Sequence, residues 1–123
     1  MTSTGGNVTV IGVTSGTIYY ANTNTGSPTW TTTLTPTGSW YAELVIASGS
    51  AYKGPVTITW QLQTDASGSW ANVGSPVVTS GVSLTGGSQT IYAATDGTLA
   101  GAYDWSQIAT GGTYQLTAVV ASA

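Results

Sequence analysis

Five charged side chains define the chemistry that this chain of 123 residues could perform: Glu43, Lys53, Asp65, Asp96 and Asp104. The chain contains no histidine and no cysteine, which removes the commonest general base and the thiol nucleophile. A serine nucleophile would need Lys53 as its base. Lys53 lies in the turn-forming sequence AYKGP, where a solvated surface lysine is the expected role.

The four carboxylates leave two further kinds of site to consider. A pair of carboxylates roughly 5–10 Å apart can cleave a glycosidic bond. Asp96 and Asp104, eight residues apart, could share a calcium ion with backbone carbonyl groups. No D-x-D-x-D run is present, and turn aspartates usually accept hydrogen bonds from backbone N–H groups. We therefore expect turn roles for Asp65, Asp96 and Asp104, no enzymatic activity and no cofactor, with Asp96 and Asp104 as the candidate calcium ligands.

The low charge of the chain limits its partners. Charged residues make up 4% of the sequence, against about 25% in ordinary soluble domains. One lysine and no arginine leave nothing to neutralise phosphates, so we expect neither nucleic acid nor an anionic membrane as a partner. The N-terminal sequence MTSTGGNVTV has neither the basic region nor the apolar run of a secretory signal.

The aromatic side chains, five tryptophans and seven tyrosines, offer contact rather than catalysis. Such rings stack on sugars or bury against another subunit. Strand parity and loop position single out Tyr19, Tyr41, Trp70, Tyr103 and Trp105 as accessible. We expect them to contact a neighbouring subunit, and a carbohydrate-binding or adhesin role is the alternative.

The elements that must position these residues are short alternating runs between turn-forming clusters, a pattern typical of β-sandwiches and barrels. In the stretch VTITWQLQ, residues 56–63, apolar and aromatic side chains alternate strictly with Thr and Gln. The expected strands are 7–14, 17–22, 29–35, 39–47, 56–64, 69–73, 77–79, 82–84, 88–93 and 113–121. We predict an all-β fold: a single antiparallel β-sandwich at 7–123, immunoglobulin-like or jelly-roll, with a short helix or none, preceded by a flexible arm at 1–6.

The C-terminal segment IATGGTYQLTAVV resembles the corner before strand F of immunoglobulin-like sandwiches. The resemblance places Ile108, Gly112 and Tyr114 in that corner and Leu116 where the second cysteine would be. It implies that Trp60 or Ile58 is the partner of Leu116 across the core. The likeness covers 54–123, but Thr110 replaces the aspartate and both cysteines are missing.

An immunoglobulin-like domain also has a strand G after strand F, and the sequence stops at Ala123. Three explanations are open. The fold is a jelly roll, an N-terminal strand takes the vacant place, or a neighbouring subunit supplies the strand.

The sequence also resembles small β-sandwich virion proteins of tailed bacteriophages, of the head-decoration type. The features that carry this are a strand–DxSGSW–strand unit from Thr64 to Trp70, the terminal GGTYQLTAVV and the richness in Gly, Ser, Thr and Ala. The resemblance implies a protein that is made in the host cytoplasm without a signal peptide and is then carried in the virion.

The uncharged Thr/Gln faces suit a surface that becomes covered. Burying an unpaired charge is costly, whereas hydroxyl and amide groups find partners, and interfaces are depleted in Lys, Glu and Asp. We therefore expect a non-enzymatic capsid decoration or stabilising protein that forms a homo-oligomer, a trimer or dimer. It would bind the major capsid protein or another virion protein through Thr2, Val8 and Val10 and the five aromatic residues named above. A compositional bias of the genome is the other explanation, and it predicts no partner.

Overall fold

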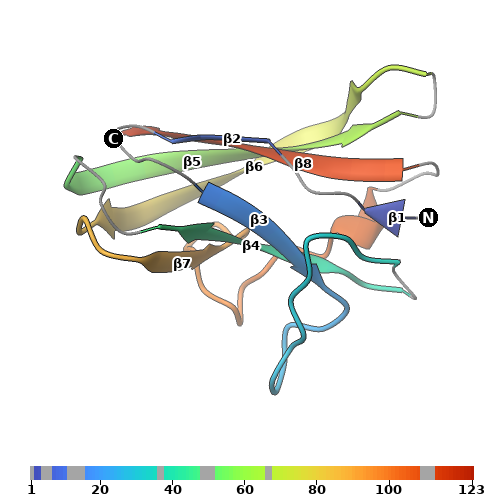
Figure 1. Cartoon of the computed structure of the whole chain (residues 1–123), viewed down its shortest axis with the longest axis horizontal. Coiled ribbons are helices and arrows are strands. Elements are labelled where there is room, and N and C mark those ends of the chain that lie inside the picture. Colours follow the sequence, from blue (N-terminus) through green and yellow to red (C-terminus); the bar gives the residue numbers. More distant parts are fainter. Residues whose placement is uncertain are drawn as a thin grey trace.

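The computed structural model describes residues 2–3, 7–10, 16–35, 38–47, 52–65, 68–108 and 113–123. These residues form two β-sheets that pack face to face around one hydrophobic core (Figure 1). The one helical element is the 3-10 turn η1 (Trp105–Gln107), within the described part of the chain. The prediction of an all-β sandwich is confirmed.

The two sheets differ in size. The smaller sheet has the order β3-β4-β7, all antiparallel, and consists of β3 (Gly16–Ala21), β4 (Tyr41–Ile46) and β7 (Gln89–Tyr92). The larger sheet has the order β1-β8-β5-β6, with β2 also on β8, and consists of β1 (Thr2–Ser3), β2 (Asn7–Val10), β5 (Gly54–Thr64), β6 (Ala71–Leu84) and β8 (Thr113–Ser122). In this sheet β6, β5 and β8 are antiparallel, while β1 and β2 run parallel to β8.

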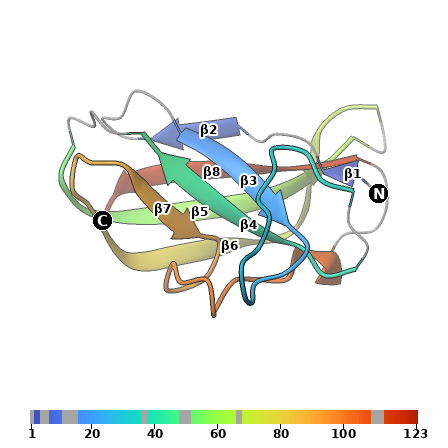
Figure 2. The same cartoon turned by 60° about the horizontal axis from the view of Figure 1, so that its bottom comes forward.

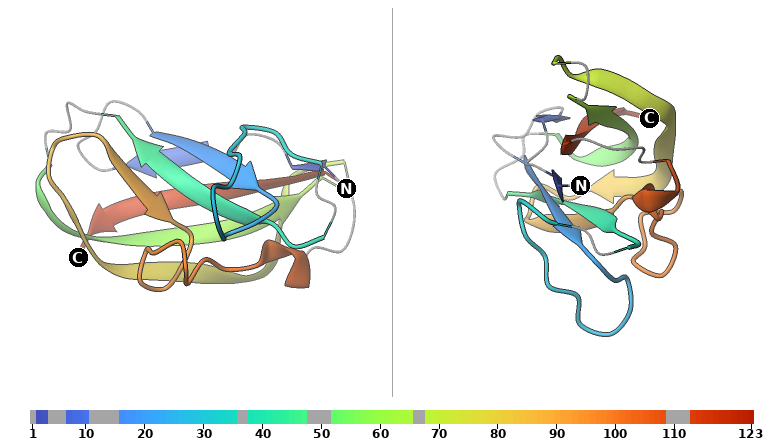
Figure 3. Two further views of the ribbon diagram at one scale, coloured as in Figure 1. Left: turned by 90° about the horizontal axis from the view of Figure 1, so that it is seen from below. Right: turned by 90° about the vertical axis from the view of Figure 1, so that its right-hand side faces the viewer.

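The core follows from side-chain alternation. On β5 the inward residues Val56, Ile58, Trp60 and Leu62 are all buried. The corresponding inward residues of the other strands meet them between the two layers. Figure 3 shows the two layers in two further views. The largest fully buried side chains are Trp40, Trp60, Trp105, Tyr20 and Tyr114.

Glycine bulges explain why three predicted strands form one. The runs predicted at 69–73, 77–79 and 82–84 are parts of the single 14-residue strand β6. The pairing of β5 with β6 shifts register at two places, which lie beside Gly74 and Gly81. Both glycines have positive φ, 68° and 79°, so they absorb the extra residues as bulges without ending the strand.

One predicted strand is wrong. Within 29–35, Thr31 forms an isolated bridge with Tyr20 and no strand develops around it. The two backbone hydrogen bonds of this bridge are 2.7 and 2.9 Å long. The Trp30 side chain turns instead towards Tyr92 of β7, and this contact replaces a ladder along the edge of β3.

The N-terminal strands pair with the last strand of the chain. β1 and β2 lie beside β8 on its edge away from β5. Of the three explanations considered from the sequence, an N-terminal strand beside β8 is the one that agrees with this pairing. Thr2–Ser3, part of the predicted arm, is therefore paired, and the other residues of that arm lie outside the described ones.

The predicted partner of Leu116 is wrong. Leu62 of β5 lies directly beside Leu116 in the same sheet, so neither Trp60 nor Ile58 of β5 faces Leu116 across the core. The residue that reaches Leu116 from the other sheet is Tyr20, whose hydroxyl oxygen accepts a hydrogen bond of 3.2 Å from the Leu116 backbone N–H. Burial raises the pKa of Tyr20 to about 12, and the hydrogen bond opposes this rise.

Candidate functional site

The outer face of the larger sheet is an extended surface without charged side chains among the described residues. The outward side chains of β5 are Thr57, Thr59, Gln61 and Gln63, all half-buried among their neighbours. This is the Thr/Gln face that the alternation of the sequence predicted. Such side chains lose little on being covered, since each polar group can find a hydrogen-bonding partner.

An apolar row crosses the middle of this face. Thr59 lies directly opposite Val78 on β6 and Val119 on β8. The two valines are the most exposed aliphatic side chains described, at 46% and 47%. Residues directly opposite on neighbouring strands have Cβ atoms about 5 Å apart, so the three side chains form one continuous ridge.

A row of amides lies beside the ridge and joins the same three strands. Gln115 of β8 donates its side-chain N–H to Gln63 Oε1 at 2.9 Å, and Gln63 donates to Asn72 Oδ1 of β6 at 3.0 Å. The Gln61 amide donates to the carbonyl oxygens of Val73 and Gly74. These side chains are already held by the sheet, so less side-chain entropy is lost when a partner covers them.

All five charged residues lie away from this face. Lys53 precedes β5 and Asp65 follows it, so both sit at its ends. Asp96 and Asp104 lie in the connection between β7 and β8, and Glu43 is on β4 of the other sheet. The face is therefore uncharged from edge to edge.

The predicted turn roles are confirmed for Asp96 and Asp104, whereas Asp65 accepts its hydrogen bond from the start of β8. Asp65 Oδ1 accepts from the Thr113 backbone N–H, and Asp96 Oδ1 accepts from the backbone and hydroxyl of Thr98. The side-chain hydrogen bond from Thr98 is the main cause that lowers the pKa of Asp96. These hydrogen bonds of Asp65 and Asp96 stabilise the ends of two loops. They do not bring one carboxyl group close to another, as a pair of catalytic carboxylates would require.

Asp104 has the most extensive role of the three. It caps η1 by accepting from the backbone and hydroxyl of Ser106, and it also accepts from the backbone N–H of Trp40 at 3.2 Å. Burial alone would raise the pKa of Asp104. The hydrogen bonds from Ser39, Ser106 and Trp40 outweigh it, so that the pKa is lowered.

The calcium candidates do not gain further ligands. Asp96 and Asp104 are each engaged by their own local segments. No group of three or more acidic, histidine or cysteine side chains able to hold a metal ion occurs in the part of the chain that the structure describes. The prediction of a calcium site finds no support in a ligand cluster.

The N-terminal interface candidates lie in the larger sheet. Thr2 pairs with Thr113, Val8 with Ala118, and Val10 with Val120, all on β8 of the same chain. Their backbone pairing is therefore intramolecular. They lie at the edge of the sheet, beside β8, which carries part of the uncharged face.

The aromatic interface candidates are dispersed. Trp70, 41% exposed, precedes β6, while Tyr19 and Tyr41 are half-buried on the outer face of the smaller sheet. Tyr103 is half-buried and packs edge-on against Trp105, with ring centroids 4.9 Å apart. The structure thus does not bring them together on one surface.

The prediction that Trp105 is accessible is wrong. Its side chain is fully buried and lies 6.3 Å from Trp40 in the core. Trp105 opens η1, and the Asp104 cap fixes this turn with the indole pointing inward. Strand parity carries no information in a helical turn, and for this reason the sequence pattern missed its burial.

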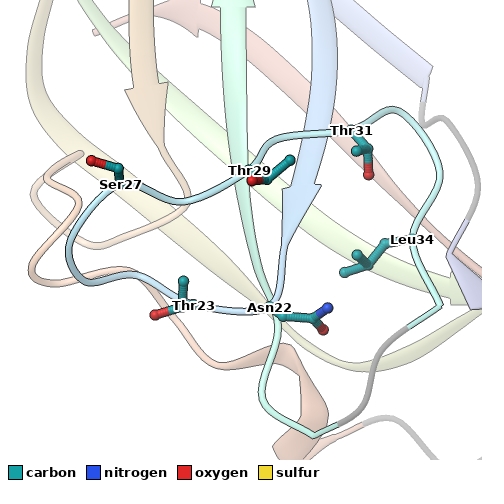
Figure 4. A pocket seen from close by; sticks show the side chains of 6 residues that line it. All are labelled: Asn22, Thr23, Ser27, Thr29, Thr31 and Leu34. Carbon is teal, nitrogen blue, oxygen red and sulfur yellow. The ribbon is translucent and has the colours of Figure 1, made fainter.

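A small pocket lies within the loop that joins β3 and β4. Its volume is about 360 Å³, and Figure 4 shows its lining residues, Asn22, Thr23, Ser27, Thr29, Thr31 and Leu34. The lining is uncharged and rich in hydroxyl groups. The pocket shares no residue with the uncharged sheet face, so the two are separate features.

The chain matches no protein-family model, no curated protein and no solved structure. Among the described residues there is also no helix of the length and apolarity that a membrane crossing requires. Function must therefore be argued from the surfaces themselves.

Proposed function

We propose that the protein is a non-enzymatic structural subunit that associates with copies of itself and with a neighbouring protein through the outer face of the larger sheet. The observation that carries the proposal is the uncharged surface around Val78, Thr59 and Val119, with its preformed amide row. A face of this kind is costly to leave in water and inexpensive to cover.

The specific form that we propose is a capsid decoration or stabilising protein of a tailed bacteriophage. A β-sandwich whose β8 edge is paired with the chain's own N-terminal segment supports a compact module that docks as a unit. A subunit that stays packed on a lattice has little need of the surface charge that keeps free proteins apart. The resemblance of the sequence to such virion proteins supports the virion as the location of the protein.

A carbohydrate-binding role is the second candidate, and the hydroxyl-lined pocket of the β3–β4 loop is the observation that favours it. The aromatic residues argue against it. All tryptophans and tyrosines lie in the described part of the chain, and Trp70 alone among them is exposed. A glycan array that shows no binding would reject this second candidate and would leave the proposed structural role unaffected.

The test is to place one charge in the middle of the face. We expect the wild-type protein to form a discrete oligomer that persists on dilution in light scattering. Thr59→Glu should shift it to the 12.4 kDa monomer, because the carboxylate would be buried without a partner. Ser88→Glu is the matched control, since Ser88 is exposed in the turn between β6 and β7.

The outcomes separate clearly. An unchanged oligomer in Thr59→Glu would contradict assembly through this face. A wild-type protein that is monomeric at every concentration would contradict self-association. In that case the capsid partner would be tested by adding the protein to undecorated particles and comparing Thr59→Glu with Ser88→Glu.

A further inference from the structure

The opposite face of the molecule holds the one buried acidic residue. Glu43 lies at the middle strand of the smaller sheet and is only 7% exposed. Tyr19 of β3 and Tyr92 of β7 lie directly opposite it, one on each side. Directly opposite residues have Cβ atoms about 5 Å apart, so two aromatic side chains flank the carboxyl group.

A third aromatic residue completes this frame. The ring of Trp30 lies 5.7 Å from that of Tyr92 at an angle of 45°. Thr31, next in the chain, is bonded to Tyr20 at the free edge of β3, whereas Tyr92 belongs to β7. The contact of Trp30 with Tyr92 therefore spans β4, which carries Glu43. Figure 2 shows the connection from β3 to β4 passing in front of these strands.

Glu43 has no partner of its own. No hydrogen bond or ion pair joins its carboxyl group to another described residue, and desolvation by burial raises its pKa. The one cationic side chain, Lys53, is exposed and precedes β5 of the other sheet. A carboxylate that is largely shielded from water and has no countercharge is unfavourable. A cation bound beside Glu43 would be attracted both by the carboxylate and by the faces of the aromatic rings.

We propose that Glu43, Tyr19, Tyr92 and Trp30 form a recognition site for an alkylammonium group, supplied by a lysine side chain of a partner protein. Neighbouring acidic ligands for a metal ion do not occur among the described residues. A lysine ammonium group is a compact charge on a flexible stem, which suits a single carboxyl group flanked by aromatic side chains. The site lies on the face opposite the uncharged one, so its partner contact is separate from that of the proposed function.

The experiment titrates the protein with n-butylammonium and follows the ring signals of Trp30, Tyr19 and Tyr92 by NMR. Butan-1-ol, of similar size but neutral, is the ligand control. We expect saturable shifts of the ring signals with n-butylammonium and none with butan-1-ol. Glu43→Gln should weaken the binding of n-butylammonium at least tenfold. The matched variant Asp96→Asn removes an exposed carboxylate elsewhere and should leave binding unchanged.

Three results would overturn the proposal: equal binding by Glu43→Gln, equal binding of the alcohol, or no saturable shift at the three rings. Trp30→Leu provides a second variant that leaves the carboxyl group in place and should also weaken binding. A blocked Gly-Lys-Gly peptide tests the source of the ammonium group. If n-butylammonium binds and the peptide does not, the assignment to a protein lysine fails.

Discussion

Thr79 is a buried hydroxyl on which two other buried groups depend. It is fully buried on β6, where its Oγ1 accepts a hydrogen bond of 2.9 Å from Trp60 Nε1 and donates to the Ala94 carbonyl oxygen. The relay joins the central tryptophan of β5 to the connection after β7. Substitution of Thr79 by valine keeps the shape of the side chain and removes both bonds.

The magnitude follows from the two groups left behind. An unsatisfied buried donor or acceptor costs about 1–3 kcal/mol. Two such groups, less about 1 kcal/mol for the added apolar group, give a loss of about 3 kcal/mol in the free energy of unfolding. Thr79→Ser keeps the hydroxyl and loses one methyl group, for a loss of about 1 kcal/mol.

The assay is urea or thermal unfolding followed by tryptophan fluorescence. For a domain of this size, the valine variant should melt roughly 10 °C below the wild type and the serine variant roughly 4 °C below it. Apolar burial alone would predict the reverse order, because valine is the more apolar residue. If Thr79→Val is as stable as Thr79→Ser or more so, the relay does not stabilise the core as argued.

Three further predictions concern the carboxyl groups and the N-terminus. Asp104→Ala should lower the free energy of unfolding by about 2 kcal/mol at pH 7, since η1 loses its cap and Trp40 its acceptor. Because folding lowers the pKa of Asp104, urea titrations should show this deficit shrinking as the pH falls through the folded value; a constant deficit would contradict the role. Glu43→Gln should be more stable than the wild type at pH 7. Folding raises the pKa of Glu43, so this advantage should vanish at a pH below its ordinary value, and a gain that persists there would refute desolvation as the cause. Deletion of residues 1–10 should leave the edge of β8 unpaired and cause concentration-dependent association beyond the wild-type oligomer in light scattering, whereas an assembly unchanged from the wild type would show that β1 and β2 are dispensable.

The sequence allowed the inner faces to be predicted well. Strict alternation over 56–63 identified the buried side of β5. Parity depends on the local backbone alone, and the folded strand keeps it. The turn roles of Asp96 and Asp104 followed for a similar reason, since each accepts a hydrogen bond from the backbone N–H group two residues further along the chain.

The features that were missed all depend on register or on distant segments. Tyr19 and Tyr92 lie beside Glu43 on two separate strands, and Trp30 reaches Tyr92 from a third segment. The apolar ridge required knowing that Val78 and Val119 both lie opposite Thr59. No single stretch of sequence contains these neighbours, so no periodic pattern could have indicated them.

The edges of the larger sheet favour its face over strand addition as the surface for the proposed association. On the free edge of β6, Pro76 offers no N–H group, Gly74 forms a bulge, and the Ser80 N–H is already bonded to the Thr95 carbonyl oxygen. At the other side, β1 and β2 cover β8. The free edge of β6 is thus a poor template for adding another strand, and the edge of β8 is already paired with β1 and β2. The face of the sheet carries no charged side chain that would oppose contact with a partner. For the proposed function, we therefore expect contacts through the face of the larger sheet rather than along its edges.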